Sequence, residues 1–221
     1  MKTIMTSLLA LLLTGAVTVG AQDKVETSLG TDIVSHYVWR GQDLGGVSVQ
    51  PTLGIGYKGF SLSSWGSVGL SNPLDTQEFD LTLAYSAGGF NIGVTDYWFD
   101  CSSYVFEANV GYDFGFASLQ WYTNFAGDDS LTETGKPAYS SYAEVNVPFT
   151  LGGVDWTTTA GAVPFATDFY GTDGFDFINL ALTAAKDIQV TDTFSIPMFT
   201  QVAFNPCVKA AYLIVGITLQ P

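Results

Sequence analysis

Acidic side chains recur at alternate positions within the apolar segments of the sequence. Because successive side chains of a β-strand point to opposite faces, these carboxylates would share one surface with the other polar groups in the same phase. The candidates on that surface are Glu26, Asp32, His36, Arg40, Glu78, Asp80, Glu107, Asp113, Glu144 and Asp155. Rings of carboxylates favour cations in water-filled pores. The pattern predicts a pore lined by these residues, with a closed interior of charge pairs and hydrogen bonds as the alternative.

Catalytic chemistry has little support among the residues. A Ser-His-acid hydrolase needs a histidine to relay the proton, and His36 is the only histidine in the sequence. It lies in phase with Asp32 and Arg40, which indicates a lumen-lining polar group. One histidine and two distant cysteines do not give the ligand spacing of a zinc site. We therefore expect no enzyme activity, no metal site and no cofactor.

The alternation extends through nearly the whole chain, and no helical periodicity follows the N-terminal segment. Short glycine-containing turns and longer polar loops separate the runs in turn, as in a barrel with short periplasmic turns and longer extracellular loops. About twelve strands are predicted, over residues 25–40, 47–57, 60–70, 78–87, 90–99, 104–114, 116–125, 139–150, 154–165, 175–186, 194–204 and 210–219. Two local irregularities stand out. The phase changes near Phe177 and Ile178, which suggests a bulge, and Asp96 falls in phase with apolar neighbours, so that either a position near the rim or an inward bulge is expected.

The composition indicates which environments the two faces meet. Only 13% of the residues are charged, against about 25% in ordinary soluble domains, so few charges remain to solubilise an outer surface. Aromatic residues, which favour membrane–water boundaries, gather at strand ends. This girdle would contain Tyr37, Trp39, Tyr57, Phe60, Tyr85, Phe90, Trp98, Tyr104, Tyr112, Phe114 and Trp156. The predicted fold is all-β, a closed antiparallel up-and-down transmembrane β-barrel. The alternative is a secreted soluble β-sandwich that binds ligands through exposed aromatics.

The N-terminus and the charge predict where the protein works. Residues 1–21 have the positive start, short apolar run and small residues before the cut that are typical of a secretory signal peptide. The alternative, a membrane-anchoring helix, needs a longer apolar run. Residues 22–221 would then form one domain in the outer membrane of a Gram-negative bacterium. A formal net charge of −14 makes nucleic acid an unsuitable partner. We expect outer-membrane lipid and lipopolysaccharide as partners, with small solutes or cations in the lumen.

The two cysteines of the exported chain, Cys101 and Cys207, fall in predicted loops. An oxidising compartment permits a disulfide between them. Pairing also requires a short Cα separation that spacing alone does not give, so both the bridged and the free states remain open.

Three short motifs carry a family resemblance. They are S-H-Y-V-W-R-G (residues 35–41), V-Q-P (residues 49–51) and G-V-T-D-Y (residues 93–97). Over roughly residues 30–100 the sequence resembles the TorF family of porin-like proteins. The resemblance implies a signal-bearing β-barrel of the bacterial outer membrane and leaves the solute open.

Overall fold

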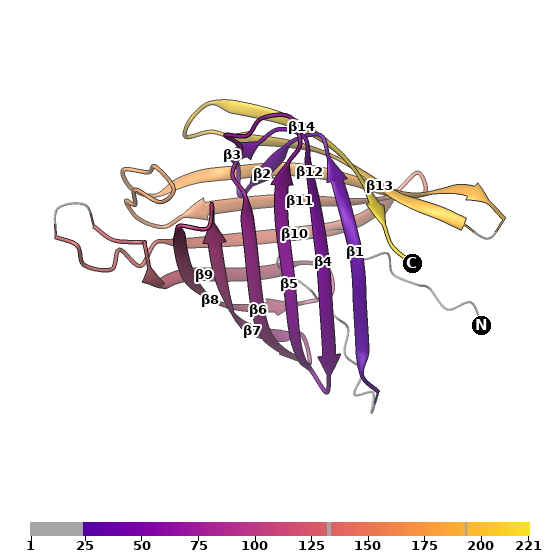
Figure 1. The fold of residues 1–221 in the computed structure, drawn as a ribbon, viewed down its shortest axis with the longest axis horizontal. Coiled ribbons are helices and arrows are strands. Elements are labelled where there is room, and N and C mark those ends of the chain that lie inside the picture. Colours follow the sequence, from indigo (N-terminus) through magenta and orange to yellow (C-terminus); the bar gives the residue numbers. More distant parts are fainter. Residues whose placement is uncertain (1–23, 132–133, 193) are drawn as a thin grey trace.

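The computed structural model of the protein describes residues 24–131, 134–192 and 194–221. These residues form fourteen β-strands, and twelve of the strands close into one barrel (Figure 1). The strands are β1 (Glu26–Val34), β2 (Tyr37–Trp39), β3 (Gln42–Gly45), β4 (Ser48–Tyr57), β5 (Phe60–Gly69), β6 (Glu78–Ala87), β7 (Phe90–Phe99), β8 (Ser103–Asp113), β9 (Ser118–Gly127), β10 (Ser141–Leu151), β11 (Val154–Val163), β12 (Asp176–Thr191), β13 (Phe194–Asn205) and β14 (Ala210–Leu219). None of the described residues belong to a helix long and apolar enough to cross a membrane. The predicted signal peptide, residues 1–21, lies outside the described residues.

Antiparallel pairing runs without interruption from β4 through β14, and β1 joins the two ends. β1 pairs with β4 along its whole length, from Glu26 to Val34. Its pairing with β14 is shorter and joins residues 31–34 to residues 216–219. The predicted closed antiparallel barrel of about twelve strands is therefore confirmed.

The wall is apolar outside and polar inside. In β6 the apolar Phe79, Leu81 and Leu83 are 51%, 45% and 57% exposed, whereas Glu78 and Asp80 are only 6% and 5% exposed. A soluble sandwich buries the apolar face of each strand instead. The alternation therefore separates a polar interior from an apolar exterior, and the sandwich alternative is not the fold observed.

The connections differ between the two ends of the barrel. At the short-turn end, tight turns such as Lys58–Gly59 and Gly88–Gly89 join neighbouring strands, and the glycines have φ of 88°, 59° and 86°. At the long-loop end the connections include residues 70–77, 128–140 and 164–175. β12 and β13 extend beyond the neighbouring strands at the short-turn end (Figure 1).

Of the two irregularities foreseen in the sequence, the bulge in β12 appears in the wall and an inward bulge at Asp96 does not. The register between β11 and β12 shifts where Gly161 pairs with Asn179 and Ala162 pairs with Phe177, so the bulge expected near Ile178 is confirmed. Asp96 shows no such shift on either side of β7. It therefore stays in phase with the outward side chains, half-buried on the outer face of the wall.

The first predicted strand, residues 25–40, is wrong in its second half. β1 ends at Val34, and the backbone N–H of Ser35 makes a last bond, of 2.8 Å, to the carbonyl of Val215. The chain then leaves the wall and forms a separate two-stranded sheet of β2 and β3. This hairpin, called the inner hairpin below, comprises residues 37–45.

Cys101 and Cys207 do not form a disulfide, and both are free thiols. Cys101 follows β7, and Cys207 lies between β13 and β14. Five strand-to-strand steps separate these two connections in either direction around the ring. They therefore lie on opposite sides of the barrel, and a disulfide needs Cα atoms within about 7 Å of each other.

Candidate functional site

The inner hairpin folds into the long-loop end of the barrel. Tyr37 and Trp39 are 2% and 7% exposed, so the expectation that they belong to the outer aromatic girdle is wrong. Their partners are inward-facing side chains of the wall, among them Glu78 of β6 and Tyr97 of β7. The hairpin therefore occupies lumen space that an open channel would leave to water.

A two-residue turn at Arg40 and Gly41 makes the hairpin possible. Both residues have positive φ, 49° and 77°, as the type I′ turn of a tight hairpin requires. A side chain at Gly41 would collide with the carbonyl of Ile178 in β12, so only glycine permits this close approach. The Gly41 carbonyl also accepts a 3.0 Å hydrogen bond from the Asn205 amide. These contacts fix the turn against β12 and β13.

Arg40 forms a bidentate ion pair with Glu107 of β8. The guanidinium Nη1 lies 2.6 Å from Oε2, and Nη2 lies 2.9 Å from Oε1. Nη1 also donates to the Tyr170 hydroxyl at 2.6 Å. Both charged side chains are almost fully buried. Parallel bonds of this kind are among the strongest in proteins and fix the orientation of both planes.

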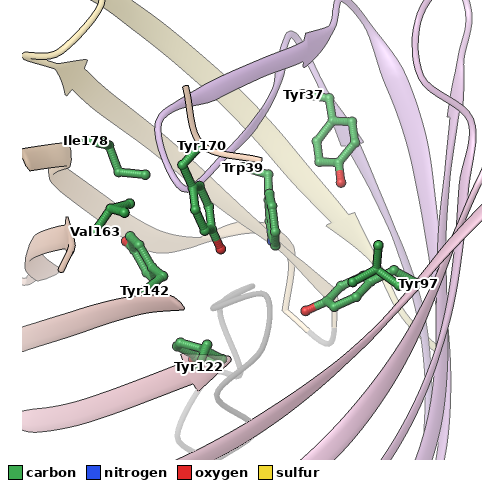
Figure 2. Packing of buried hydrophobic residues seen from close by; sticks show 9 residues of the cluster. Tyr37, Trp39, Tyr97, Tyr122, Tyr142, Val163, Tyr170 and Ile178 are labelled. Atoms are coloured by element: carbon green, nitrogen blue, oxygen red, sulfur yellow. The ribbon is translucent and has the colours of Figure 1, made fainter. Parts of the chain in front are cut away.

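Aromatic rings enclose the same guanidinium. Its carbon lies 4.0 Å from the ring centre of Tyr122, 4.4 Å from that of Trp39 and 4.7 Å from that of Tyr142. Trp39 is in turn stacked on Tyr170, with ring centres 6.2 Å apart. Figure 2 shows these rings converging on one space from different elements. A cation over several ring faces is attracted to each of them, more strongly where water is excluded.

The surroundings keep Arg40 charged. Burial alone would lower the pKa of the guanidinium, but the carboxylate of Glu107 and the neighbouring phenols of Tyr170 and Tyr97 raise that pKa above its ordinary value. Among the described residues, Arg40 is the only buried basic side chain. The hairpin thus places one permanent positive charge inside an otherwise acidic lumen.

A second set of contacts holds the base of the hairpin. The Tyr37 hydroxyl donates to Glu78 at 2.6 Å, and its ring lies 5.6 Å from that of Trp65. The backbone N–H of Thr76 donates to the carbonyl of Leu44 at 3.0 Å, and that of Gly46 donates to Asp75 at 3.1 Å. The loop between β5 and β6 therefore braces the outer side of the hairpin.

The loops between β9 and β10 and between β11 and β12 hold Tyr170 in place. Asp129 accepts hydrogen bonds from the backbone and hydroxyl of Ser140 at 2.9 and 2.7 Å. Ser140 is in turn hydrogen-bonded to Thr167, and the segment between Thr167 and Thr172 carries the Tyr170 ring inward. Asp129 is therefore a buried structural carboxylate, although it lies in a loop.

The residues predicted to line a pore separate into two groups by height. At the long-loop end lie Asp32, His36, Arg40, Glu78, Asp80, Glu107 and Glu144. At the short-turn end lie Glu26, Asp113 and Asp155, all at least partly accessible to water. The structure therefore brings the first group together around the hairpin and leaves the second group at the opposite rim.

Most of the first group is hydrogen-bonded, although the Oδ1 atom of Asp80 is buried without a hydrogen-bond partner. Asp32 accepts from Thr218 at 2.6 Å across the short seam between β1 and β14. Glu144 accepts from the Tyr142 hydroxyl and the Asn146 amide, both at 2.7 Å, and so orients a ring that encloses Arg40. His36 does not contact Arg40; its Nε2 lies 2.8 Å from Asp43 within the hairpin. These contacts agree in part with the alternative given by the sequence, a closed interior of charge pairs and hydrogen bonds.

Water-accessible space remains beside the hairpin. A cavity of about 110 Å³ has room for several water molecules. Its polar lining includes Asp32, Gln50, Glu144, Asn179 and Gln201, from five different strands, and Arg40 and Trp39 border it. The hairpin thus narrows the lumen at one end and leaves a polar space at its side.

Sequence reasoning missed the rings that receive the hairpin. Tyr97, Tyr122 and Tyr142 lie in the inward phase of β7, β9 and β10, which was visible as alternation. Tyr170 lies in a loop, where alternation says nothing. Within the described ranges, no group of three or more His, Cys, Asp or Glu side chains is arranged to hold a metal ion.

Comparisons with known proteins carry no argument about the fold or the function of this chain. No family model matches the chain, and no curated protein matches it. One solved structure, that of a porin, is similar over 91% of this chain and 79% of the porin chain, with 16% identity and a TM-score of 0.38. A likeness at this level does not bear on function. The resemblance to the TorF family stays a prediction.

Proposed function

We propose that this protein is a porin-like barrel of the bacterial outer membrane, through which small solutes or ions pass by diffusion along an acidic lumen. The observation that supports the proposal is the inverted wall, apolar on its exposed face and polar on its buried face. Soluble monomers rarely expose contiguous apolar patches larger than a few hundred Å². In hydrocarbon such a wall is favourable, because closure leaves few backbone groups unpaired.

The position of the exposed aromatic rings agrees with this environment. Tyr57, Phe60 and Tyr85 lie next to the short turns, and Trp98 and Tyr104 lie at the long-loop end, all at the ends of strands. All of these residues except Tyr85 are well exposed. Two belts of this kind are typical of outer-membrane barrels. We therefore place the long loops outside the cell, facing lipopolysaccharide, and the short turns in the periplasm.

The inner hairpin makes a closed structural barrel the second candidate. It places Arg40, Trp39 and Tyr37 across the long-loop end. The cavity beside it supports a restricted passage instead. The acidic lining on both sides of the hairpin predicts a preference for cations. Neither candidate calls for catalysis.

Conductance of the refolded protein in planar bilayers separates the two candidates. We expect small single-channel steps and a reversal potential that indicates cation preference. Migration that changes on heating in a detergent gel would first establish that the barrel is folded. A folded barrel that remains silent over a wide range of voltages would remove the passage and leave the structural barrel.

A further inference from the structure

The space that holds the Arg40 guanidinium has the composition of a ligand-binding site. Four of its side chains belong to the wall or its loops: Glu107 in β8, Tyr122 in β9, Tyr142 in β10 and Tyr170 between β11 and β12. They supply a carboxylate in bidentate geometry, a hydroxyl acceptor and two ring faces. Only Trp39 and Arg40 itself come from the hairpin. The wall would therefore present most of the site without the hairpin.

The chemistry of the site selects a planar cation. A guanidinium presents several N–H donors in one plane, which match both oxygens of a carboxylate and also stack on aromatic rings. An ammonium group is a point charge without this fork. An anion would meet the Glu107 carboxylate. The site thus fits guanidinium groups better than the other charged groups of small solutes.

The occupant is unusual in this sequence. Arg40 is the only arginine among the 221 residues. It lies at the tip of a hairpin that forms its own two-stranded sheet and shares no strand pairing with the barrel. A tip that reaches four separate elements through one side chain has the form of a tethered ligand.

We propose that Glu107, Tyr122, Tyr142 and Tyr170 form a binding site for solutes that carry a guanidinium group, and that Arg40 occupies this site in place of such a solute. This inference depends on the proposed function in one respect only, that the site lies on the path of the solute. Guanidinium-bearing cations are then the class that the lumen recognises, and the inner hairpin competes with them. Because a tethered group acts at a high effective concentration, free solutes compete weakly while Arg40 is present.

The test therefore removes the tethered group and supplies a free one. Arg40→Asn gives the sequence Asn-Gly, which two-residue hairpin turns favour, so the turn is retained while the guanidinium is lost. The probe is methylguanidinium, titrated into refolded R40N protein in detergent and followed by tryptophan fluorescence, since Trp39 borders the site. Urea serves as the neutral planar control, methylammonium as the non-planar cation, and sodium chloride controls for ionic strength.

We expect a saturable fluorescence change with methylguanidinium in R40N and none with urea or sodium chloride. Binding of methylammonium should be at least about tenfold weaker, because the bidentate charge-assisted bonds are lost. The double variant R40N/E107Q should bind methylguanidinium about tenfold or more weakly than R40N for the same reason. A folded R40N protein without a saturable response, or with the same response after E107Q, overturns the site.

If R40N refolds poorly, the folded fraction becomes the readout. Methylguanidinium present during refolding should raise the heat-modifiable folded band of R40N but not that of R40N/E107Q, and equal urea should have no such effect. Absence of this rescue also overturns the site. Bilayer recordings separate the two proposals: binding without conductance removes only the passage, and conductance that ignores methylguanidinium removes only the site.

Discussion

Neutralising the partner of Arg40 should destabilise the folded protein strongly. In Glu107→Gln the side chain keeps its shape, but the guanidinium loses the charge that faces it at 2.6 and 2.9 Å. Both groups are almost fully buried, so hydration compensates little for the lost partner. Breaking such a pair by changing one member typically costs about 3–5 kcal/mol. We expect the free energy of unfolding of E107Q to fall by about this amount.

A double-mutant cycle isolates the pair from other effects of the substitutions. Arg40→Asn alone leaves the Glu107 carboxylate buried without its cation, and a loss of similar size, about 3–5 kcal/mol, is expected. In R40N/E107Q no unpaired charge remains at this site. The double variant should therefore lose at least about 2 kcal/mol less than the sum of the single losses.

The assay is urea-induced unfolding of the barrel in lipid vesicles, followed by tryptophan fluorescence and by the heat-modifiable band. The inner hairpin could detach from Glu107 and the surrounding rings before the wall unfolds. Protease cleavage within residues 37–45 would then occur at a lower urea concentration than the global transition. Single losses that add within about 0.5 kcal/mol in the double variant would show that the two residues do not interact. That result would refute the claim that the Arg40–Glu107 ion pair holds the inner hairpin in the barrel.

Further substitutions test neighbouring parts of the structure. Gly41→Ala should displace the inner hairpin and increase its cleavage by protease, because the new methyl group meets a backbone carbonyl of β12. Gly88→Ala, also at positive φ but with open space around it, should cost only about 1–2 kcal/mol in unfolding free energy. Tyr37→Phe removes the hydroxyl that donates to Glu78, and a loss of about 1–3 kcal/mol in urea unfolding is expected for the buried carboxylate left with one bond fewer; an unchanged midpoint would contradict this contact. Asp96→Val on the outer face should raise the unfolding free energy in vesicles, because it removes a carboxylate from the lipid-facing surface. The gain should be smaller than the cost of about 2–4 kcal/mol for an Arg or Lys at the bilayer midplane. A decrease would show that this side chain does not face lipid.

The wall could be predicted from the sequence because its rule is local. Alternation with a period of two places Phe79 and Asp80 on opposite faces wherever the strand lies. The inner hairpin could not be predicted in the same way, since residues 35–40 continue the alternation of β1, and over so short a segment a strand and one arm of a hairpin leave the same local pattern. What distinguishes them is the Arg40–Gly41 turn and its contacts with Glu107, which is 67 residues away. Spacing carries no information about such distant contacts.

The state of the cysteines and the role of the tyrosines follow from the same distinction. Once the strand order is fixed, the loops of Cys101 and Cys207 lie on opposite sides of the ring, although each loop alone gave no reason to exclude a disulfide. The inward phase of Tyr122 and Tyr142 was readable, but their use as a surface for a cation depends on where the hairpin tip arrives.

Accessibility along β6 tests the central claim, that the exposed apolar face meets hydrocarbon while the opposite face encloses water. Single cysteines at residues 79–84, in a background without Cys101 and Cys207, would carry nitroxide labels in protein reconstituted into vesicles. The account predicts that labels at 79, 81 and 83 collide with dissolved oxygen and not with a water-soluble nickel chelate, and that labels at 80, 82 and 84 do not show this preference for oxygen. The account would be contradicted if labels at 79, 81 and 83 collided with the nickel chelate as readily as labels at 80, 82 and 84 do.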